Sequence, residues 1–339
     1  MSVIHHTANA HVAYHDLLRI LQDAQVEGLR GTAQLQNVNK KQYWYDNYRI
    51  GKDQVWTYIG EDSAELRDRL TRMTSIRALA KERTATQSRL VRQLRAEGVI
   101  GTDARTGSLL AAFSKAGVFR LGGTIVGTMA FRLYENELGV RISSDQLMQT
   151  DDMDIASFER LSFALRDPVE EPLQAVLANF KFDPLPSMDH TRIWRWRQAS
   201  TETLVEFLTP AFGEEGIRDL PALGVSAQAL HYLNYLIADP IKAVALYRSG
   251  ILVQIPRPER YAIHKLIVAT RRSTGIDSLK ARKDRAQAAF LIEVLAQDRP
   301  DELAEAYAEA RGQGPRWRER LDMSLARMPQ TAAQLVATG

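Results

Sequence analysis

Hydrophobic positions recur along this chain with two periods, one typical of helices and one typical of strands. Residues 9–28 repeat apolar side chains at steps of three and four residues, which is the spacing of one helix face. The same spacing over 62–97 predicts a long helix that also carries many arginines. Further helices are expected at 107–116, 129–138, 169–180, 259–272, 279–297, 299–311 and 316–327.

Strand signals fall in two regions of the chain. Between residues 33 and 60, aromatic and β-branched residues flank a Gly51-Lys52-Asp53 turn, which predicts a β-hairpin or small meander. Because helices and strands are mixed along the chain, we expect an α+β fold. Shorter apolar runs predict strands at 118–126, 152–156, 193–198, 204–208 and 251–255.

Changes in composition divide the chain into three expected units. A basic helical region with the aromatic hairpin covers 1–100, a core covers 101–215, and a mainly helical region covers 216–339. The chain has 339 residues, of which 45% are hydrophobic and 25% are charged, so it resembles ordinary globular proteins. Its net charge of +3 is too small to require a nucleic-acid partner.

Absent residue types and patterns narrow the chemistry. The chain has no cysteine, which excludes disulfides, thiolate nucleophiles and cysteine-based zinc sites. Neither a P-loop nor a Gly-x-Ser-x-Gly elbow occurs, which argues against a P-loop NTPase and a serine hydrolase of that type. No secretory pattern and no apolar run of about 18 residues is visible, so we expect a cytoplasmic protein without a membrane span.

The most informative segment is the acidic stretch at 150–156. If it forms a strand, Asp152 and Asp154 point to one face while Met153 and Ile155 face the core. Two like charges roughly 6–7 Å apart repel by about 2–3 kcal/mol at an effective dielectric near 20, which a bound cation would offset. Carboxylate oxygens favour Mg²⁺ or Mn²⁺. The alternative is a surface turn or a helix N-cap, where such pairs of acids are common.

Two further features accompany this acidic pair. The expected strand at 118–126 ends at Gly127 and Thr128, where a helix begins and can offer free N–H groups to a phosphate. Glu206 lies inside an otherwise apolar strand, and a buried carboxylate without a partner is costly. Either a shared metal ion or a salt bridge to Arg195 or Arg197 on the neighbouring strand would compensate it.

Together these features resemble the nucleotidyltransferase superfamily that includes polymerase beta and the minimal bacterial nucleotidyltransferases. In that superfamily an apolar strand ends in Gly-[Gly/Ser/Thr] and opens a helix, a D-x-D strand follows, and a third acid lies on an adjacent strand. The matching residues here are Gly127 and Thr128, then Asp152 and Asp154, then Glu206. A bacterial branch of the superfamily looks similar over the segments VGTMAFRLYENELGVR, TDDMDIA, TLVEFLTP, VQIPRPERYAIHKLIVATRR and QYWYDNYRIGKDQVWTYIG.

The resemblance implies a mixed sheet with flanking helices and a metal-dependent reaction. Asp152, Asp154 and Glu206 would hold two divalent ions, Mg²⁺ or Mn²⁺, while an NMP passes from an NTP to a hydroxyl and pyrophosphate leaves. Glu206 would also assist deprotonation of the acceptor. This chain departs from the family pattern in having glutamate as the third acid and a long gap before Asp152, which implies an inserted loop at 139–149.

Basic side chains should neutralise the triphosphate that the resemblance implies. Lys265 is the first candidate, because it follows His264 near the start of an apolar helix. Arg271, Arg272 and Lys283 are further candidates. For these three, a solvated helix face is the ordinary alternative.

The aromatic hairpin is a candidate nucleic-acid-binding arm. Tyr43, Trp44, Tyr45, Arg49 and Lys52 interleave rings with cations, which suits stacking on bases and contact with phosphates. The alternative is that these aromatic residues form strands well and pack a small core.

The acceptor hydroxyl stays open between an RNA end, a protein side chain and a small molecule. Three other functions also remain: a non-catalytic nucleic-acid-binding protein on a degenerate nucleotidyltransferase fold, a toxin- or defence-type enzyme that modifies tRNA, and a protein-interaction module.

Overall fold

The computed structural model describes residues 3–25, 31–38, 41–50, 53–142, 152–158, 169–187, 192–272 and 276–338. Lys52 and residues 143–149 of the expected inserted loop lie outside these ranges.

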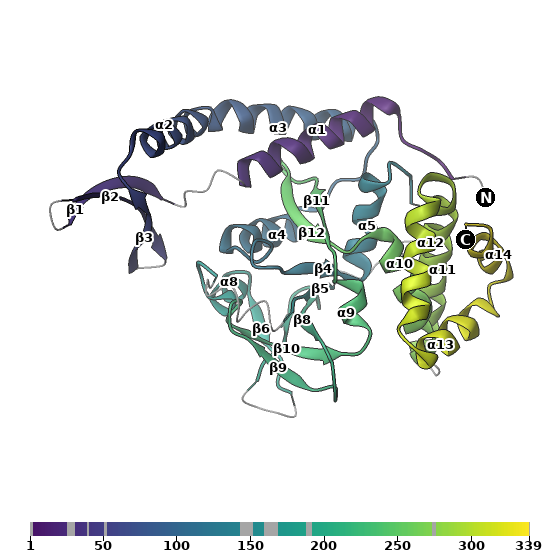
Figure 1. Ribbon diagram of the computed structural model, residues 1–339. Helices are drawn as coiled ribbons and strands as arrows, with labels where there is room; N and C mark the ends of the chain where they lie inside the picture. The colour runs from purple at the N-terminus through teal and green to yellow at the C-terminus, as the bar shows by residue number, and fades with distance from the viewer. Residues whose placement is uncertain are drawn as a thin grey trace.

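A mixed seven-stranded sheet forms the centre of the molecule (Figure 1). Strands β5 and β8 are parallel, as are β8 and β10, whereas β4 and β9 run antiparallel to their neighbours at the two ends of the main path. The strands come from both sides of residue 215. In order they are β4 (Thr124–Val126), β5 (Met153–Ala156), β8 (Leu204–Pro210), β10 (Val225–Leu230) and β9 (Ile217–Leu220), with β7 (Arg195–Gln198) beside β8 and β6 (Phe182–Pro184) beside β7.

Alternation along β5 and β8 separates the core from the acids. Met153 and Ile155 are 2% and 0% exposed, which confirms that they face the core. On β8, Val205 and Phe207 are buried in the same way. Because side chains alternate along a strand, the residues between them are directed to the other face of the sheet.

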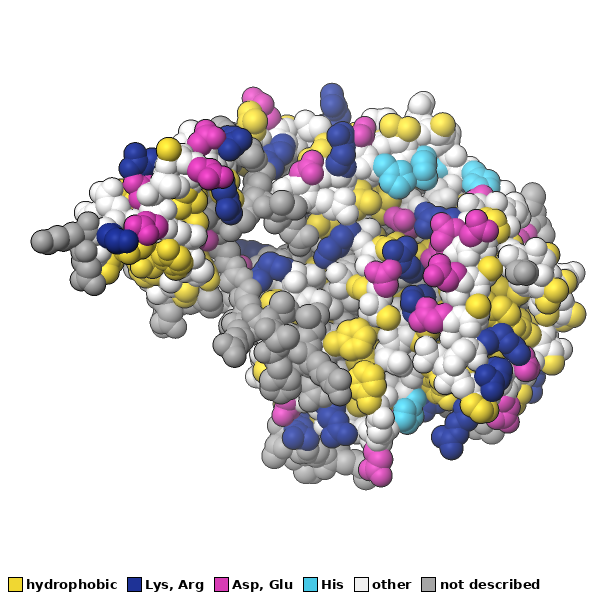
Figure 2. All heavy atoms as spheres, in the orientation of Figure 1, with side chains coloured by type: hydrophobic (Ala, Val, Ile, Leu, Met, Phe, Trp, Pro, Cys, Tyr) yellow, Lys and Arg dark blue, Asp and Glu magenta, His cyan; other side chains and the backbone are white. Residues whose placement is uncertain are grey.

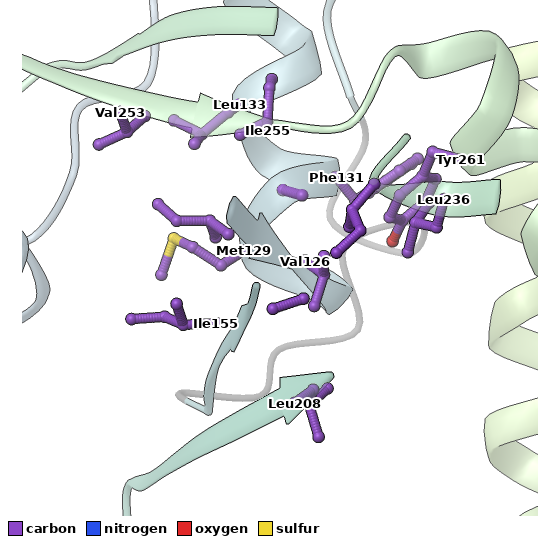
Figure 3. Packing of buried hydrophobic residues seen from close by; sticks show 14 of the residues in the cluster. Val126, Met129, Phe131, Leu133, Ile155, Leu208, Leu236, Val253, Ile255 and Tyr261 are labelled. Atoms are coloured by element: carbon purple, nitrogen blue, oxygen red, sulfur yellow. The ribbon is translucent and has the colours of Figure 1, made fainter. Parts of the chain in front are cut away.

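Helices cover the sheet and are joined to it by one continuous core. Apolar side chains from β4, α5 (Gly127–Glu137), β5 and the β11–β12 hairpin converge in this core (Figure 3). The hairpin consists of β11 (Ile241–Ala245) and β12 (Ile251–Ile255). The other helices of this region are α4 (Ala104–Ala116), α8 (Leu173–Asn179) and α9 (Leu233–Leu236).

The C-terminal helices stack on one side of the sheet (Figure 1). Helix α10 contacts α11, α12 and α13, so it links the stack to the sheet region. A proline at the first turn favours the start of α10, α12 and α13, because proline lacks only an N–H that would be free there. The helices are α10 (Pro258–Arg271), α11 (Ile276–Asp298), α12 (Pro300–Gly312), α13 (Pro315–Leu325) and α14 (Pro329–Thr338).

Part of the N-terminal region extends away from this body (Figure 1). Helix α1 (Ala8–Gln25) packs along α3 (Ala80–Ala96), with Leu17 and Leu94 buried between them. At the far end of the pair lies a three-stranded antiparallel meander, which confirms the expected hairpin or meander (Figure 1). We call this meander and the following helix the arm: β1 (Thr32–Val38), β2 (Lys41–Ile50), β3 (Asp53–Glu61) and α2 (Ala64–Ala78).

Several element predictions need correction. The strand expected at 118–126 is limited to Thr124–Val126, because Gly117 and Gly122 have positive φ angles of 94° and 88° and the chain between them forms turns. The long helix expected at 62–97 is two helices that meet near Leu79. Helix α5 begins two residues earlier than expected, and α14 was not predicted.

Within the described ranges, none of the helices combines the length and the apolar composition that a bilayer crossing requires.

Candidate active site

The acidic residues of two strands stand side by side. Asp154 of β5 pairs in register with Glu206 of β8 in the parallel part of the sheet. Residues paired across strands share a face, so both carboxylates are directed away from the core. On its other side Asp154 pairs with Val126, and Glu206 pairs with Arg195. The predicted proximity of the D-x-D motif to the third acid is therefore present in the backbone register.

Asp152 reaches the same region from the residue just before β5. Its Oδ1 accepts a hydrogen bond of 3.2 Å from the backbone N–H of Leu204, the first residue of β8. This bond directs the Asp152 carboxylate toward the strand that carries Glu206. Asp152 therefore lies close enough for its charge to act on both Asp154 and Glu206.

The carboxyl pKa values of Asp154 and Glu206 are both raised. Burial, followed by the charges of Glu206 and Asp152, raises the pKa of Asp154 to about 7, against the opposing effects of Lys265 and Arg272. Burial also raises the pKa of Glu206, with Asp152 adding to the rise and Arg195 opposing it. A cation bound between these groups would stabilise their ionised forms.

Salt bridges do not account for the acids. Within the described ranges, no ion pair joins Asp152, Asp154 or Glu206 to a basic residue. Arg195 lies opposite Glu206, but its guanidinium stacks 5.1 Å from the Trp194 ring centre, and its Nε has no hydrogen-bond partner among the residues that the structure describes. Arg197 pairs with Leu204 and is exposed. The arginine alternative for Glu206 is thus not realised as a direct contact.

A preformed metal cage is absent from the part of the chain that the structure describes. No three histidine, aspartate or glutamate side chains converge there closely enough to hold a metal ion. The donors themselves are hard carboxylate oxygens, which suit Mg²⁺ and Mn²⁺. A cation shared by these acids would require their side chains to move toward one another.

The start of α5 lies directly beside Asp154. Gly127 is its first residue and has a positive φ of 63°, and a Cβ at this position would overlap Oδ2 of Asp154. Val126 precedes it in an extended conformation, and no side chain of the described residues caps the helix. Thr128 is the next residue and is half-buried. The free N–H groups and the positive end of the helix dipole therefore meet the acidic group.

A cavity of about 260 Å³ opens at this junction. Gly127 and Asp154 line it from the sheet side, and Lys265, Arg271 and Arg272 line it from α10. Of the predicted nucleotide-binding residues, Gly127 and Lys265 thus share one cavity with Asp154, whereas Thr128 does not line it. Its remaining wall is largely aliphatic and includes Leu208, Leu230, Leu233, Leu236 and Val268.

The comparisons with known proteins bear on the same residues. A family model described as nucleotidyltransferase matches residues 104–312, which is more than half of the chain. The chain belongs to the nucleotidyltransferase family. The matched stretch begins with α4 and ends with α12, so it includes the acids, Gly127 and Lys265, and it excludes the arm. No curated protein and no solved structure matches the chain.

Helix α11 of this nucleotidyltransferase supplies Lys283, which was a predicted candidate, and also Asp284 and Lys280, which the sequence interpretation missed. Asp284 is 1% exposed and binds both Lys265 and Arg272. Lys283 is buried, and burial and the charge of Lys265 lower its pKa. Lys280 lies close enough to Glu206 to lower the pKa of that carboxyl. The sequence signal for Asp284 was a single aspartate within the basic run LKARKDRAQ. The charge pattern of this run also fits a helix face that is exposed to solvent.

His264 and Tyr261 complete the α10 face of the cavity. Burial, followed by the charge of Lys265, lowers the pKa of His264 to about 3, so its imidazole is neutral near pH 7. The hydroxyl of Tyr261 lies 2.8 Å from the carbonyl oxygen of Gly127 and 3.0 Å from Oε1 of Gln287, and it can donate to either. Tyr261 therefore links α10 to the start of α5.

The aromatic residues of the arm divide between two faces of the meander. The ring of Tyr58 lies 6.0 Å from that of Tyr43 and 5.7 Å from that of Tyr45, and Tyr45 lies 6.5 Å from Trp56. We call these four rings the aromatic face. Hydrophobic side chains gather visibly on the arm in Figure 2. Trp56 and Tyr58 are 41% and 56% exposed, so the aromatic face does not form a closed core.

Trp44 has a different place from its neighbours. It lies between Tyr43 and Tyr45 along β2, and its indole N–H donates a 2.8 Å bond to Asp62. Asp62 also binds Arg67 of α2, so Trp44 ties the meander to the helix. Arg49 is exposed near the end of β2.

Proposed function

We propose that this nucleotidyltransferase moves an NMP from an NTP to an acceptor hydroxyl and releases pyrophosphate, with Mg²⁺ or Mn²⁺ held by Asp152, Asp154 and Glu206. The observation that carries the proposal is the register of Asp154 and Glu206 beside the uncapped start of α5. This arrangement brings Asp154, the start of α5 and basic side chains to one cavity, with Glu206 beside Asp154 on the adjacent strand.

The acidic residues fit two divalent ions by their chemistry. They offer hard oxygen donors, and burial, together with the charges of neighbouring acids, raises the pKa of Asp154 and of Glu206. When bound, the ions supply charge neutralisation for the phosphate chain and for the two oxygens of the displacement. Asp154 lies between Gly127 and Glu206, so it is the residue best placed to bind both ions.

Glu206 is the candidate proton acceptor. Its raised carboxyl pKa brings its proton affinity closer to neutral pH, which favours transfer of a proton from an acceptor hydroxyl. Asp152 is bonded to the backbone of Leu204 and would orient the same group of ligands from the start of β8. The resulting alkoxide would attack the α-phosphorus in line with the leaving pyrophosphate.

The phosphate chain would lie between the start of α5 and the basic face of α10. The N–H groups at Gly127 and Thr128 would donate to phosphate oxygens, and the helix dipole would favour the negative charge. Lys265, Arg271 and Arg272 would neutralise the triphosphate from the other side of the cavity. The aliphatic wall offers a surface for the base or sugar.

We also propose RNA as the acceptor, bound by the arm. The aromatic face exposes rings on which unstacked bases can pack, and stacking of this kind tolerates many sequences. Exposed Arg49 on β2 and exposed Arg69 on α2 could contact the backbone phosphates. The bond network from Trp44 through Asp62 to Arg67 would hold this surface in place.

A label-transfer assay tests the proposed activity. The protein would be incubated with Mg²⁺ or Mn²⁺, a cell extract and each of the four NTPs labelled at the α-phosphate. Transfer of label by the wild type and its loss in Asp154→Asn are expected. RNA binding without label transfer would favour the non-catalytic alternative, and label appearing in tRNA would favour a tRNA-modifying enzyme. A protein that neither binds an NTP nor transfers label would favour an interaction module.

A further inference from the structure

Asp284 lies behind the cavity and holds two of its basic residues. Its Oδ1 is 2.6 Å from Nζ of Lys265, and its other carboxylate oxygen contacts Nη1 of Arg272. Lys265 lies on α10 and Arg272 is the C-cap of that helix, so one carboxylate of α11 ties both cations. We propose that Asp284 is the positioning residue of the triphosphate site, which fixes Lys265 and Arg272 toward the phosphates. This inference rests on the proposed function.

The arrangement explains why Asp284 acts through other residues. Lys265 and Arg272 line the cavity together with Asp154, whereas Asp284 does not line it and is 1% exposed. An ammonium group and a guanidinium group have several N–H donors each, so binding to Asp284 leaves further donors for phosphate oxygens. The carboxylate thus restricts two flexible side chains without using their full hydrogen-bonding capacity.

Charges around Asp284 support a role in the site. Lys265 and Arg272 both lower the carboxyl pKa of Asp154, so the positions of these cations affect the central acid. Lys283 adds a third positive group beside Lys265, and it is buried. Without the negative charge of Asp284, these three cations would repel one another and their side chains would spread. Triphosphate binding would then require them to be gathered again.

A second ion pair on α10 provides a matched control. Arg260 binds Glu309 of α12 at 2.6 Å, and neither residue lines the cavity. The Glu309→Gln change removes the carboxylate partner of Arg260, which lies on α10, and leaves the ion pairs of Lys265 and Arg272 in place. A loss that follows only from the change at Asp284 would therefore not reflect a general weakening of α10.

The test measures binding of inorganic tripolyphosphate and of adenosine to the full chain by calorimetry, alongside thermal unfolding. We expect Asp284→Asn to weaken tripolyphosphate binding by about tenfold to a hundredfold, the loss of one or two charge-assisted hydrogen bonds. Adenosine binding should not change, and Glu309→Gln should bind tripolyphosphate like the wild type. Asp284→Glu, which restores the charge, should recover part of the affinity.

Two results would overturn the inference. Unchanged binding by a folded Asp284→Asn would show that the cations need no fixing, and tighter binding would show that Asp284 competes with the phosphates. If Asp284→Asn does not fold, the Lys265→Met/Asp284→Asn double variant removes both partners and is compared with Lys265→Met. Weaker tripolyphosphate binding by the double variant is expected, because Arg272 is released as well, and equal or tighter binding would contradict the inference.

These outcomes are separate from those of the proposed activity. If the wild type transfers label from an NTP while Asp284→Asn binds tripolyphosphate normally, only the inference about Asp284 fails. If the wild type transfers no label but Asp284→Asn still weakens tripolyphosphate binding, the positioning role stands and the proposed transfer reaction fails.

Discussion

Asp154 and Glu206 stand opposite one another on the parallel strands β5 and β8, with both side chains on the face away from the core. Their like charges are only partly offset by nearby cations, and the pKa of Asp154 is raised to about 7. The fold therefore keeps an arrangement that lowers its own stability at neutral pH. Functional sites often retain such unfavourable groups, because activity depends on them. Removing such a group commonly stabilises the protein and abolishes its activity.

Asp154→Asn should stabilise the metal-free protein, and more so at pH 8 than at pH 5. The folded pKa of about 7 exceeds the unfolded value of 3.8, so the folded state keeps the proton longer and wild-type stability falls as pH rises from about 4 to about 7. The variant has no carboxyl group at position 154, so its stability does not fall with pH for this reason. We expect its advantage in free energy of unfolding to grow by about 2–3 kcal/mol between pH 5 and pH 8.

Urea unfolding at the two pH values measures this advantage. Asp183→Asn is the control, because Asp183 is an exposed carboxylate on β6 of the same sheet. It should show no pH-dependent gain. An equal effect of Asp154→Asn at both pH values would mean that the carboxyl is not perturbed.

Mn²⁺ should stabilise the wild type through the same acids. A ligand at one hundred times its Kd adds about 2.7 kcal/mol to the free energy of unfolding. At pH 8 we expect the Tm to rise with Mn²⁺ concentration in the wild type, and to respond much less in Glu206→Gln or Asp154→Asn. A Mn²⁺ response that survives in both variants would place the metal elsewhere.

Gly127→Ala should impair NTP binding through a contact rather than through backbone strain alone. A Cβ at this position would overlap the Asp154 carboxylate at the start of α5. Gly224→Ala is a close control, because Gly224 has a φ of 64° against 63° for Gly127, and no atom of the described residues lies within 4 Å of a Cβ added there. Each change costs about 1 kcal/mol in backbone strain.

We expect only Gly127→Ala to reduce NTP affinity and transfer, by about tenfold or more, since a 1.4 kcal/mol loss has this effect. Calorimetry with the preferred NTP and the label-transfer rate provide the two measurements. Equal behaviour of the two alanine variants would remove Gly127 from the phosphate site.

Trp56→Ala/Tyr58→Ala should weaken binding of single-stranded RNA without lowering the Tm. Both rings are exposed, and stacking on a base contributes about 1–3 kcal/mol, so a loss of about tenfold or more is expected. Leu35→Ala is the control, because Leu35 is also exposed but pairs with Trp44 on the other face of the meander. Fluorescence anisotropy with a labelled oligonucleotide distinguishes them. Unchanged affinity in the double variant would exclude the aromatic face as the RNA surface.

The local patterns of this chain predict its main elements well. Alternation places Met153 and Ile155 in the core, and the apolar strand around Glu206 follows the same rule. The family is likewise confirmed from a short motif and several longer segments. The shortened strand before Gly127 was missed because two glycines with positive φ convert an apolar run into turns, and apolar character alone does not reveal φ.

The wider contacts of the site depend on tertiary structure. Asp284 lies 130 residues beyond Asp154 in the sequence, and nothing in its neighbourhood indicates that α11 packs behind α10. Arg271 and Arg272 fit a solvated helix face equally well until the cavity is known. In the arm, Trp44 and Tyr45 are adjacent in sequence, but a register irregularity and strand alternation give them different partners.

Parallel reactions with α-labelled and γ-labelled NTP measure whether this protein transfers a nucleoside monophosphate. We expect the wild type to incorporate the α-label into the acceptor and to release the γ-label as pyrophosphate in equal amount. Glu206→Gln and Asp154→Asn should do neither. Incorporation of the γ-label, or undiminished incorporation of the α-label by both variants, would contradict the proposed transfer.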